Sequence, residues 1–442
     1  MNTLEDDVFV SYQSKSGLSL KMGTHKTEHR VFLASFVLLA MLGSLAYGTA
    51  IWYFKMWPYQ DIVVLGQHAR NLKNYGVWAP ESLFVPAPEQ ASRKRIHIIV
   101  PDEFPAGYRA ILGWDTAASE HAVWLFDSEG KERHRWGFHL SSIYPENKSG
   151  VSGKSHALAI LSDGSIVVNL EDQVMARLDA CSKPLWMKRG SYHHSLDLAE
   201  DGTMWIWRGE SSHSSHYQFL HNFNPKTGKV VKELSLVDDF IKTNPNSEVI
   251  FRLPKNFAFN HTGEGPITDL FHTNDVEVLG KALADKFPQF RAGDLLVSLR
   301  NINLVAVLAP DEKIIRWWRQ GPWIMQHDPD FGPDGRISVY NNNMNRRHSN
   351  IIFVDPASNS IDFLPASGSS VFYSREMGKH QRLPNGNILI TIPKEGRVIE
   401  TTAAGKPVFE FNNIYSEKVN ASVSNARWLP FDYFKTFPSC KN

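Results

Sequence analysis

The chain is poor in cysteine, with only Cys181 and Cys440 among its 442 residues. Two cysteines exclude a disulfide-rich scaffold and a structural zinc site built from cysteine ligands. They leave two alternatives open, either a single disulfide, which requires an exported domain, or two unpaired thiols.

The chain also has no large surplus of positive or of negative residues, because it contains 47 Lys and Arg and 46 Asp and Glu, and its net charge is +1. This balance excludes the basic surface that is typical of a nucleic-acid-binding protein. The sequence also has no glycine-rich phosphate loop, so it offers a nucleotide no obvious cradle and indicates no cofactor. It has no HExxH motif either, which leaves a metal site only weakly supported.

Aromatic and turn-forming residues, by contrast, are plentiful. Aromatic side chains make up 12% of the chain, with 13 Trp, and there are 29 Gly and 24 Pro. This composition is typical of many short strands joined by turns rather than of a helical bundle.

One long stretch without charge occupies residues 31–54. At about 1.5 Å per residue it exceeds the ~30 Å thickness of a hydrocarbon core, so it predicts a transmembrane helix. Trp52, Tyr53 and Trp57 would form an aromatic belt at its end. The stretch is longer than the apolar region of most signal peptides, which favours a retained anchor, although AYGTA at residues 46–50 leaves cleavage open.

The flanking charges give the expected orientation. Four basic residues at positions 15–30 precede the span and three at positions 55–73 follow it, a slight bias toward a cytoplasmic N-terminus. We therefore expect a single-pass membrane protein with residues 1–30 as a cytoplasmic tail and the main domain periplasmic or extracellular. Residues 55–106 are expected to form a juxtamembrane helix and a linker.

The rest of the chain contains a repeated unit: a His, a short alternating strand, a turn with Gly and a second strand. Copies start at His156, His194 and His327, each eight residues before the turn glycine. A copy with a shorter first strand starts at His380, and one with an enlarged turn starts at His272.

A second hairpin, with a polar turn and an aromatic residue, alternates with the first. Its six copies start at Val123, Val174, Tyr217, Val305, Asn350 and Arg397. Together the two hairpins make six four-stranded sheets, the first of which starts at Gly107 and lacks the His.

Such an array predicts an all-β fold, a six-bladed β-propeller over residues 107–434, because radial closure hides the edge strands that a linear array would expose. Residues 419–434 offer a last strand that would complete the ring, and residues 435–442 form a C-terminal tail.

In a propeller, residues at the start of the innermost strands face one another across the central channel, so the five repeat histidines are expected to converge there. Histidines at such positions can also serve structure alone, by capping a strand or binding a neighbouring blade. If they bind a ligand, imidazoles beside Asn274, Arg300 and Arg346 suit a sulfuryl or phosphoryl group, whose oxygens accept charge-assisted hydrogen bonds. A His can also be the nucleophile of a covalent mechanism.

Four segments make the sequence similar to a known family: FHTNDVEVL (residues 271–279), GDLLVSLRNIN (293–303), QHDPDFGPDGRISVYNN (326–342) and LPNGNILI (383–390). In their order and spacing they resemble the nucleotide-independent, periplasmic, propeller-shaped arylsulfotransferases. The resemblance implies transfer of a sulfuryl group from an aryl sulfate to a phenol through a sulfated His.

Carried over by motif, the resemblance implies that His327 is the nucleophile, aided by the pair His272 and Asn274, by Arg300 and by His194. His156 and His380 match only the repeat and are expected, with Arg346, to bind substrate.

Two acids depart from the family pattern. Asp275 stands where the family usually has Ser, and Asp328 with Pro329 stands where small polar residues are usual. They predict negative charge next to two key histidines. The leading hypothesis is thus a membrane-anchored arylsulfotransferase-like enzyme, and the alternative is a non-catalytic propeller that binds a ligand or protein at the membrane surface. A metal-dependent hydrolase is a third hypothesis, which requires a bound metal.

Overall fold

A computed structural model of the chain describes residues 24–54, scattered positions between 56 and 73, and residues 83–146, 154–209, 218–253 and 269–440. The expected cytoplasmic tail before residue 24 and most of the expected juxtamembrane helix lie outside these residues. The chain divides into two compact units, residues 1–70 and 71–442, which are described separately.

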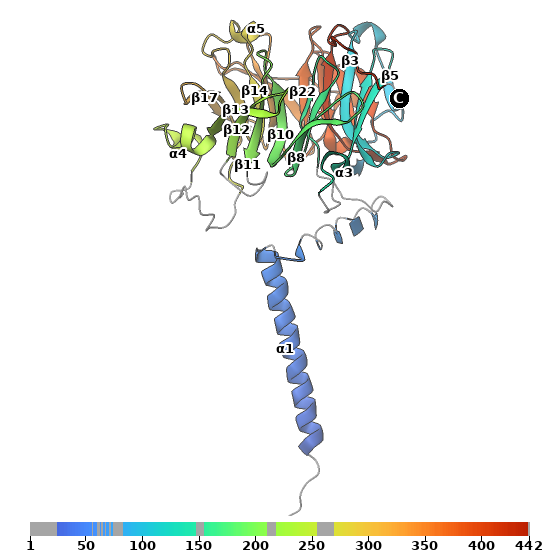
Figure 1. Ribbon diagram of the computed structural model, residues 1–442, viewed down its shortest axis with the longest axis vertical. Coiled ribbons are helices and arrows are strands. Elements are labelled where there is room, and N and C mark those ends of the chain that lie inside the picture. Colours follow the sequence, from blue (N-terminus) through green and yellow to red (C-terminus); the bar gives the residue numbers. More distant parts are fainter. Residues whose placement is uncertain are drawn as a thin grey trace, which may run out of the picture. The chain divides into compact units, whose positions relative to one another are not determined.

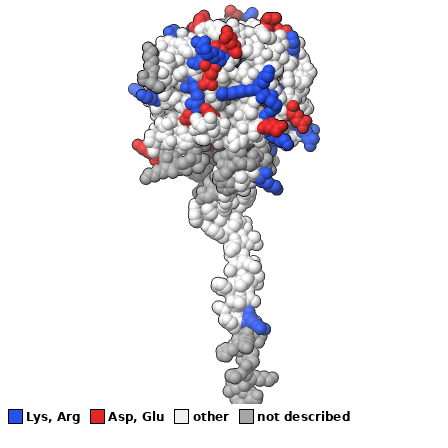
Figure 2. Space-filling model, turned by 90° about the vertical axis from the view of Figure 1, so that its right-hand side faces the viewer, with Lys and Arg blue, Asp and Glu red and all other residues white. Residues whose placement is uncertain are grey.

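The first unit contains helix α1 (Thr24–Phe54). Its segment His29–Phe54 has a mean hydropathy of 2.0 and is long and apolar enough to cross a membrane. Large apolar side chains point outward along it, including Leu39 and Leu45, which are each 68% exposed. Figure 2 shows this helix nearly free of charged side chains, whereas charges of both signs are interspersed over the second unit. The predicted apolar helix is therefore confirmed, and its exposed surface is suited to lipid.

The second unit is a propeller of six antiparallel sheets, here called blades 1 to 6, each given from its innermost to its outermost strand. Blade 1 consists of β27 (Val423–Leu429), β3 (Tyr108–Asp115), β4 (Glu120–Phe126) and β5 (Glu132–Phe138). Blade 2 consists of β6 (Leu158–Ile160), β7 (Ile166–Leu170), β8 (Val174–Leu178) and β9 (Pro184–Arg189). Blade 3 consists of β10 (Ser191–Leu198), β11 (Met204–Gly209), β12 (Gln218–Asn224) and β13 (Lys229–Ser235). Blade 4 consists of β14 (Thr273–Val278), β15 (Leu295–Leu299), β16 (Leu304–Ala309) and β17 (Ile314–Gln320).

Blade 5 consists of β18 (His327–Phe331), β19 (Ile337–Asn341), β20 (Asn350–Val354) and β21 (Ile361–Phe363). Blade 6 has five strands, β22 (Lys379–Arg382), β23 (Ile388–Ile392), β24 (Arg397–Thr401), β25 (Pro407–Asn412) and β2 (Ile96–Ile98). Short helices α3 (Leu140–Ile143), α4 (Ser247–Ile250) and α5 (Lys281–Ala284) lie in the connections. The six-bladed propeller that the repeats predict is confirmed.

The ring is closed by strands from both ends of the domain. The C-terminal strand β27 pairs with β3, and Figure 1 shows these red and blue-green segments side by side. The strand that starts after Gly107 is therefore the second strand of blade 1, and the blade lacks the His because the C-terminus supplies its inner strand. Within the segment expected to be a linker, β1 (Phe84–Pro86) pairs with β26 (Val419–Ala421) and β2 extends blade 6.

A disulfide holds the closing segment in place. Cys181 in the outer hairpin of blade 2 is bonded to Cys440, with their Cα atoms 4.9 Å apart. Just beyond β27, the hydroxyl of Tyr433 donates a hydrogen bond to the carbonyl oxygen of Ile160 in β6. The C-terminal chain thus crosses from blade 1 to blade 2, and the two cysteines are paired.

The core consists of the faces between neighbouring blades. Between blades 3 and 4, Trp207, Phe240 and Leu295 are buried in one apolar cluster. Tryptophan side chains also bridge blades, since the indole of Trp136 in blade 1 donates to the Gly164 carbonyl in blade 2. Apolar burial and these indole bonds hold each blade to the next, so the inner strand starts have fixed positions around the axis.

Candidate functional site

The inner strands of blades 3, 4 and 5 are bulged where they begin. The pairing with the second strand shifts after His193, after Thr273 and after His327. At or next to these shifts the backbone has positive φ, 59° at His194, 49° at His272 and 48° at Asp328. A bulge re-aims the side chains beside it, and left-handed non-glycine residues persist only where the surroundings enforce them. The local backbone therefore turns the histidines toward the axis.

Four of the five repeat histidines meet in one cavity of about 150 Å³. The residues that line it are Lys154, His156, Glu171, His194, Asp269, His272, Arg300, His327, Glu376 and Met377. His194 lies at the centre, because its ring centroid is 5.0 Å from that of His272, 5.6 Å from that of His156 and 6.5 Å from that of His327. We call this space the histidine cavity.

The hydrogen bonds of His327 define its protonation state. The Asn342 amide donates to the carbonyls of Ser374 and Met377, so its Oδ1 is left to accept from His327 Nδ1, 2.7 Å away. The backbone N–H of Met377 donates a hydrogen bond to His327 Nε2 at 3.2 Å. Burial, and then the charge of Arg300, lower the pKa of His327 to about 3. His327 is therefore a neutral imidazole with its lone pair at Nε2.

Arg300 supplies the cavity with a cation that has few partners. Its guanidinium donates to Asn301 Oδ1 at 3.3 Å and approaches the Met344 sulfur at 3.9 Å. Its Nε is buried and has no hydrogen-bond partner, and among the described residues Arg300 forms no ion pair. Burial lowers its pKa. A guanidinium with unused donors in a cavity is suited to bind an anion.

Carboxyl groups complete the wall. The carboxylate of Asp269 is hydrogen-bonded to Nδ1 of His272. Glu171 Oε1 lies 3.5 Å from His194 Nδ1 and 3.9 Å from His156 Nδ1. Burial lowers the pKa of both His156 and His194 well below the ordinary value. His156, Glu171 and His194 offer ligand atoms within 4.8 Å of one another, so they form a candidate metal site, as do Asp328, Asp330 and His380.

Glu171 was not identified from the sequence, although the repeat contains a signal for it. Glu171, Arg300 and Asn342 each follow the turn glycine of their blade by seven residues. All three therefore stand directly after the second strand of a blade, beside the axis. The second hairpin strand, and not only the first, delivers functional side chains to the cavity.

Three of the expected site residues lie elsewhere. Asn274 donates from its amide to the Gln326 backbone carbonyl at 2.8 Å and does not line the histidine cavity. Arg346 is exposed on a loop that is not part of the lining. His380 is buried outside the cavity, where it contacts Asp328 at 3.0 Å and Ser338 at 2.8 Å.

The position of His380 follows from strand register. His380 pairs with Ile390, the fourth residue after Gly386. In blade 5, the residue that pairs with the fourth residue after the turn glycine is Pro329 rather than His327. Strand β22 has no bulge, so Lys379 stands at the register position of His327 and His380 points away from it.

Lys379 contacts both of the acids that depart from the family pattern. Its Nζ is buried and donates to Asp275 at 2.7 Å and to Asp328 at 2.5 Å. It also donates to the hydroxyl of Ser195, the residue after His194. The pKa of Lys379 is raised, chiefly by the charges of these two carboxylates, against the opposing effect of burial. The acids therefore form a buried ion-pair cluster and are not free charges in the cavity.

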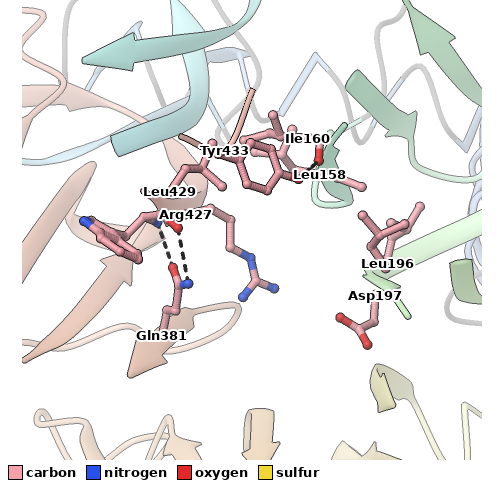
Figure 3. Close-up of a pocket in the computed structure, with 11 residues that line it drawn as sticks. Leu158, Ile160, Leu196, Asp197, Gln381, Arg427, Leu429 and Tyr433 are labelled. Carbon is pink, nitrogen blue, oxygen red and sulfur yellow. Dashed lines mark hydrogen bonds between the residues drawn. The ribbon is translucent and has the colours of Figure 1, made fainter. Parts of the chain in front are cut away.

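A second cavity of about 300 Å³ lies where the inner strands end. Leu158, Leu196 and Leu429 give it apolar walls, and Asp197 and Arg427 face its interior (Figure 3). In blade 6, Met377 lines the histidine cavity and Gln381 the second one, with Lys379 between them in sequence. The channel thus has a polar chamber at the strand starts and a more apolar one at the strand ends.

The fold and the site together define a β-propeller with a histidine-lined, arginine-containing pocket. The model of the arylsulfotransferase (ASST) family matches residues 157–414, more than half of the chain. The chain belongs to the arylsulfotransferase family, which supports an enzyme of the sulfotransferase type.

Other comparisons add no functional information. No curated protein matches the sequence. Among solved structures, a protein of unknown function from Bacteroides caccae is 12% identical, with 72% of this chain and 99% of that one covered and a TM-score of 0.45. Virginiamycin B lyase from Staphylococcus aureus is 14% identical, with 60% and 71% covered and a TM-score of 0.35.

Proposed function

We propose that this protein transfers a sulfuryl group from an aryl sulfate to a phenol through a sulfated His327. In the first half-reaction His327 Nε2 gives up the hydrogen bond that it accepts from the backbone N–H of Met377 and forms a bond to sulfur. The bond from sulfur to the aryl oxygen breaks, and the aryl oxygen takes the electron pair. In the second half-reaction the oxygen of a phenol takes the sulfuryl group from His327. The observation that carries the proposal is the position of His327, whose Nδ1 is held by Asn342 in the same cavity as Arg300.

The other cavity residues have roles that suit this chemistry. Arg300 and His272 bind the sulfuryl oxygens, where preorganised donors stabilise the charge that develops in the transition state. His194 lies between the other rings and assists proton transfer. Asn274 acts indirectly, because its amide holds the carbonyl of Gln326, the residue before the nucleophile. His156 contacts substrate from the opposite wall.

The remaining expected binding residues lie outside the histidine cavity. Neither His380 nor Arg346 lines it, so in this proposal neither touches the transferred group.

We further propose that α1 anchors the enzyme with its N-terminus in the cytoplasm and its propeller outside. The paired Cys181 and Cys440 support this orientation, because structural disulfides persist mainly in oxidising compartments. Protease added to intact cells or spheroplasts should digest the propeller. Protection that is lost only on lysis would contradict the orientation.

The test of the reaction uses the full chain in detergent with 4-nitrophenyl sulfate and no acceptor. We expect a burst of nitrophenol stoichiometric with protein and a sulfuryl adduct on the His327 peptide, which added phenol removes. The variant His327→Asn should give neither, whereas the matched variant His380→Asn should retain both. Absence of phenol release with a range of aryl sulfates would favour the non-catalytic binding propeller.

A further inference from the structure

The ammonium group of Lys379 joins the inner strands of four consecutive blades. Lys379 is buried and stands in β22 of blade 6. A lysine ammonium has three N–H donors, and each of them has an acceptor here. The acceptors are the hydroxyl of Ser195 in blade 3, Asp275 Oδ1 in blade 4 at 2.7 Å and Asp328 Oδ1 in blade 5 at 2.5 Å. Lys379 thus uses its full donor capacity to bridge these strands.

The acceptors stand at the bulged strand starts of the histidine cavity. Each directly follows a residue of the proposed site, in the pairs His194–Ser195, Asn274–Asp275 and His327–Asp328. The backbone has positive φ at two of these places, 59° at His194 and 48° at Asp328. Such backbone in a residue other than glycine persists only where its surroundings enforce it. The bonds of Lys379 supply that constraint where the histidines turn toward the axis.

A second path of hydrogen bonds links the same strands. The Ser195 hydroxyl donates to the Asn274 carbonyl at 3.1 Å, and the Asn274 amide donates to the Gln326 carbonyl at 2.8 Å. Gln326 is the residue before His327, and the residue after His327 is an acid bonded to Lys379. The bonds therefore close a circuit that starts and ends at Lys379 and contains the proposed nucleophile. We call it the lysine circuit.

We propose that Lys379 is a positioning residue of the sulfuryl transfer, an inference that rests on the proposed function. Its ammonium holds the strand starts of blades 3, 4 and 5 at the spacing that aligns His327 Nε2 with the sulfuryl group on Arg300 and His272. Lys379 does not line the histidine cavity, so it touches neither donor nor acceptor. A misplacement of about 1 Å at the reacting atoms costs roughly 10²-fold in rate, so such a constraint governs the chemical step.

The contacts of Asp328 favour this role over a metal site. Its Oδ1 accepts from Lys379, and its Oδ2 accepts from the backbone N–H of His380. Both carboxylate oxygens are therefore engaged by protein donors. The positive charge of the ammonium also opposes a metal cation at the same carboxylate.

The test separates positioning from stability with two variants. The triple variant Lys379→Met, Asp275→Asn, Asp328→Asn removes the ammonium together with the charges that it balances, so it should retain most of the wild-type stability in urea. Ser195→Ala cuts the lysine circuit and leaves both ion pairs of Lys379 in place. Ser165→Ala is the matched control, at a buried serine in the first turn of blade 2 whose hydroxyl bonds lie outside the circuit.

Single-turnover release of 4-nitrophenol from 4-nitrophenyl sulfate, over a series of donor concentrations, gives the saturating rate and the half-saturating concentration separately. We expect the saturating rate to fall roughly 10²-fold in the triple variant and roughly 10-fold in Ser195→Ala, because bond formation requires alignment. The half-saturating concentration should stay near the wild-type value, because Arg300 and His272 hold the donor and belong to no bond of the circuit. Ser165→Ala should match the wild type in both quantities.

A wild-type saturating rate in a folded triple variant would overturn the role of Lys379 while the sulfated His327 stands. A raised half-saturating concentration at an unchanged saturating rate would overturn it as well, because the loss would then lie in donor binding. If the triple variant does not fold, Ser195→Ala decides, and a saturating rate equal to that of Ser165→Ala would overturn the proposal. A wild type that releases no phenol from any donor would overturn the sulfuryl transfer and this inference together.

Discussion

Blades 2 to 5 and blades 6 and 1 use their inner strands in opposite ways. The first group delivers His156, His194, His272 and His327 to one cavity. The second delivers Lys379 and Arg427, whose charges interact with a group of acidic side chains, Asp197, Asp275, Glu277, Asp328 and Asp330. Four blades thus carry the histidines of the cavity, and the other two supply cations that balance neighbouring acidic side chains.

The difference shows that sequence repeat and structural register are separate properties. His327 and His380 begin similar sequence units, yet only His327 enters the cavity. A single bulge residue, present after His327 and absent from β22, decides between the two outcomes.

The largest effect should distinguish these two histidines. We expect His327→Asn to lower the rate of sulfuryl transfer by at least roughly 10³-fold, as for loss of a nucleophile. His380→Asn should instead cost about 1–3 kcal/mol of unfolding free energy, through its lost bonds to Asp328 and Ser338, and change the rate little. Burst kinetics and urea unfolding measure the two quantities. Comparable losses of rate in His327→Asn and His380→Asn would contradict the difference in role between these two histidines.

Lys379 tests the role of blades 6 and 1 in balancing the charge of buried acids. Lys379→Met leaves Asp275 and Asp328 buried without their cation, and we expect a loss of about 3–5 kcal/mol in the free energy of unfolding. The triple variant that adds Asp275→Asn and Asp328→Asn should recover most of this loss, because it removes the uncompensated charges. If the single variant unfolds at the wild-type urea midpoint, Lys379 does not support the histidine cavity.

Arg300 tests the role of positive charge in the histidine cavity. We expect Arg300→Gln to lower transfer by roughly 10²–10³-fold, because the guanidinium is the charged donor that this proposal places on the transferred oxygens, beside His272. Arg346→Gln, on an exposed loop, is the matched control and should retain near wild-type rates. A loss in the control equal to that in Arg300→Gln would shift the anion site to the rim.

Much of the fold could be read from the sequence because each blade carries its own local signals. The turn glycines and the alternating strands define hairpins within short segments, and six pairs of hairpins leave few closed arrangements. The role of β27 was only partly predictable. Residues 419–434 were expected to close the ring, but nothing in their pattern shows that they supply the inner strand of blade 1.

The site was harder to predict because it depends on contacts between distant blades. Lys379 and Asp275 are 104 residues apart in the chain, so the neutralisation of that acid is invisible in either motif. Glu171 carries a positional signal, its distance from the turn glycine, but its residue type differs from Arg300 and Asn342 at the same position. Position in the repeat was therefore informative, whereas histidine as the marker identified only four of the ten residues that line the cavity.

The smallest effect expected is the dependence of stability on pH. The folded-state pKa of His327 is about 3, below its ordinary value of 6.5, so the unfolded chain binds a proton below pH 6.5 that the folded chain does not. Protonation of His327 in the unfolded chain therefore lowers the stability of the fold as the pH falls from 6.5 toward 3, by about 2 kcal/mol between pH 6.5 and 5. Urea unfolding across this range should show a shallower slope in His327→Asn than in the wild type. Parallel slopes would mean that the imidazole of His327 takes up a proton normally in the folded protein. His327 would then not be the neutral nucleophile.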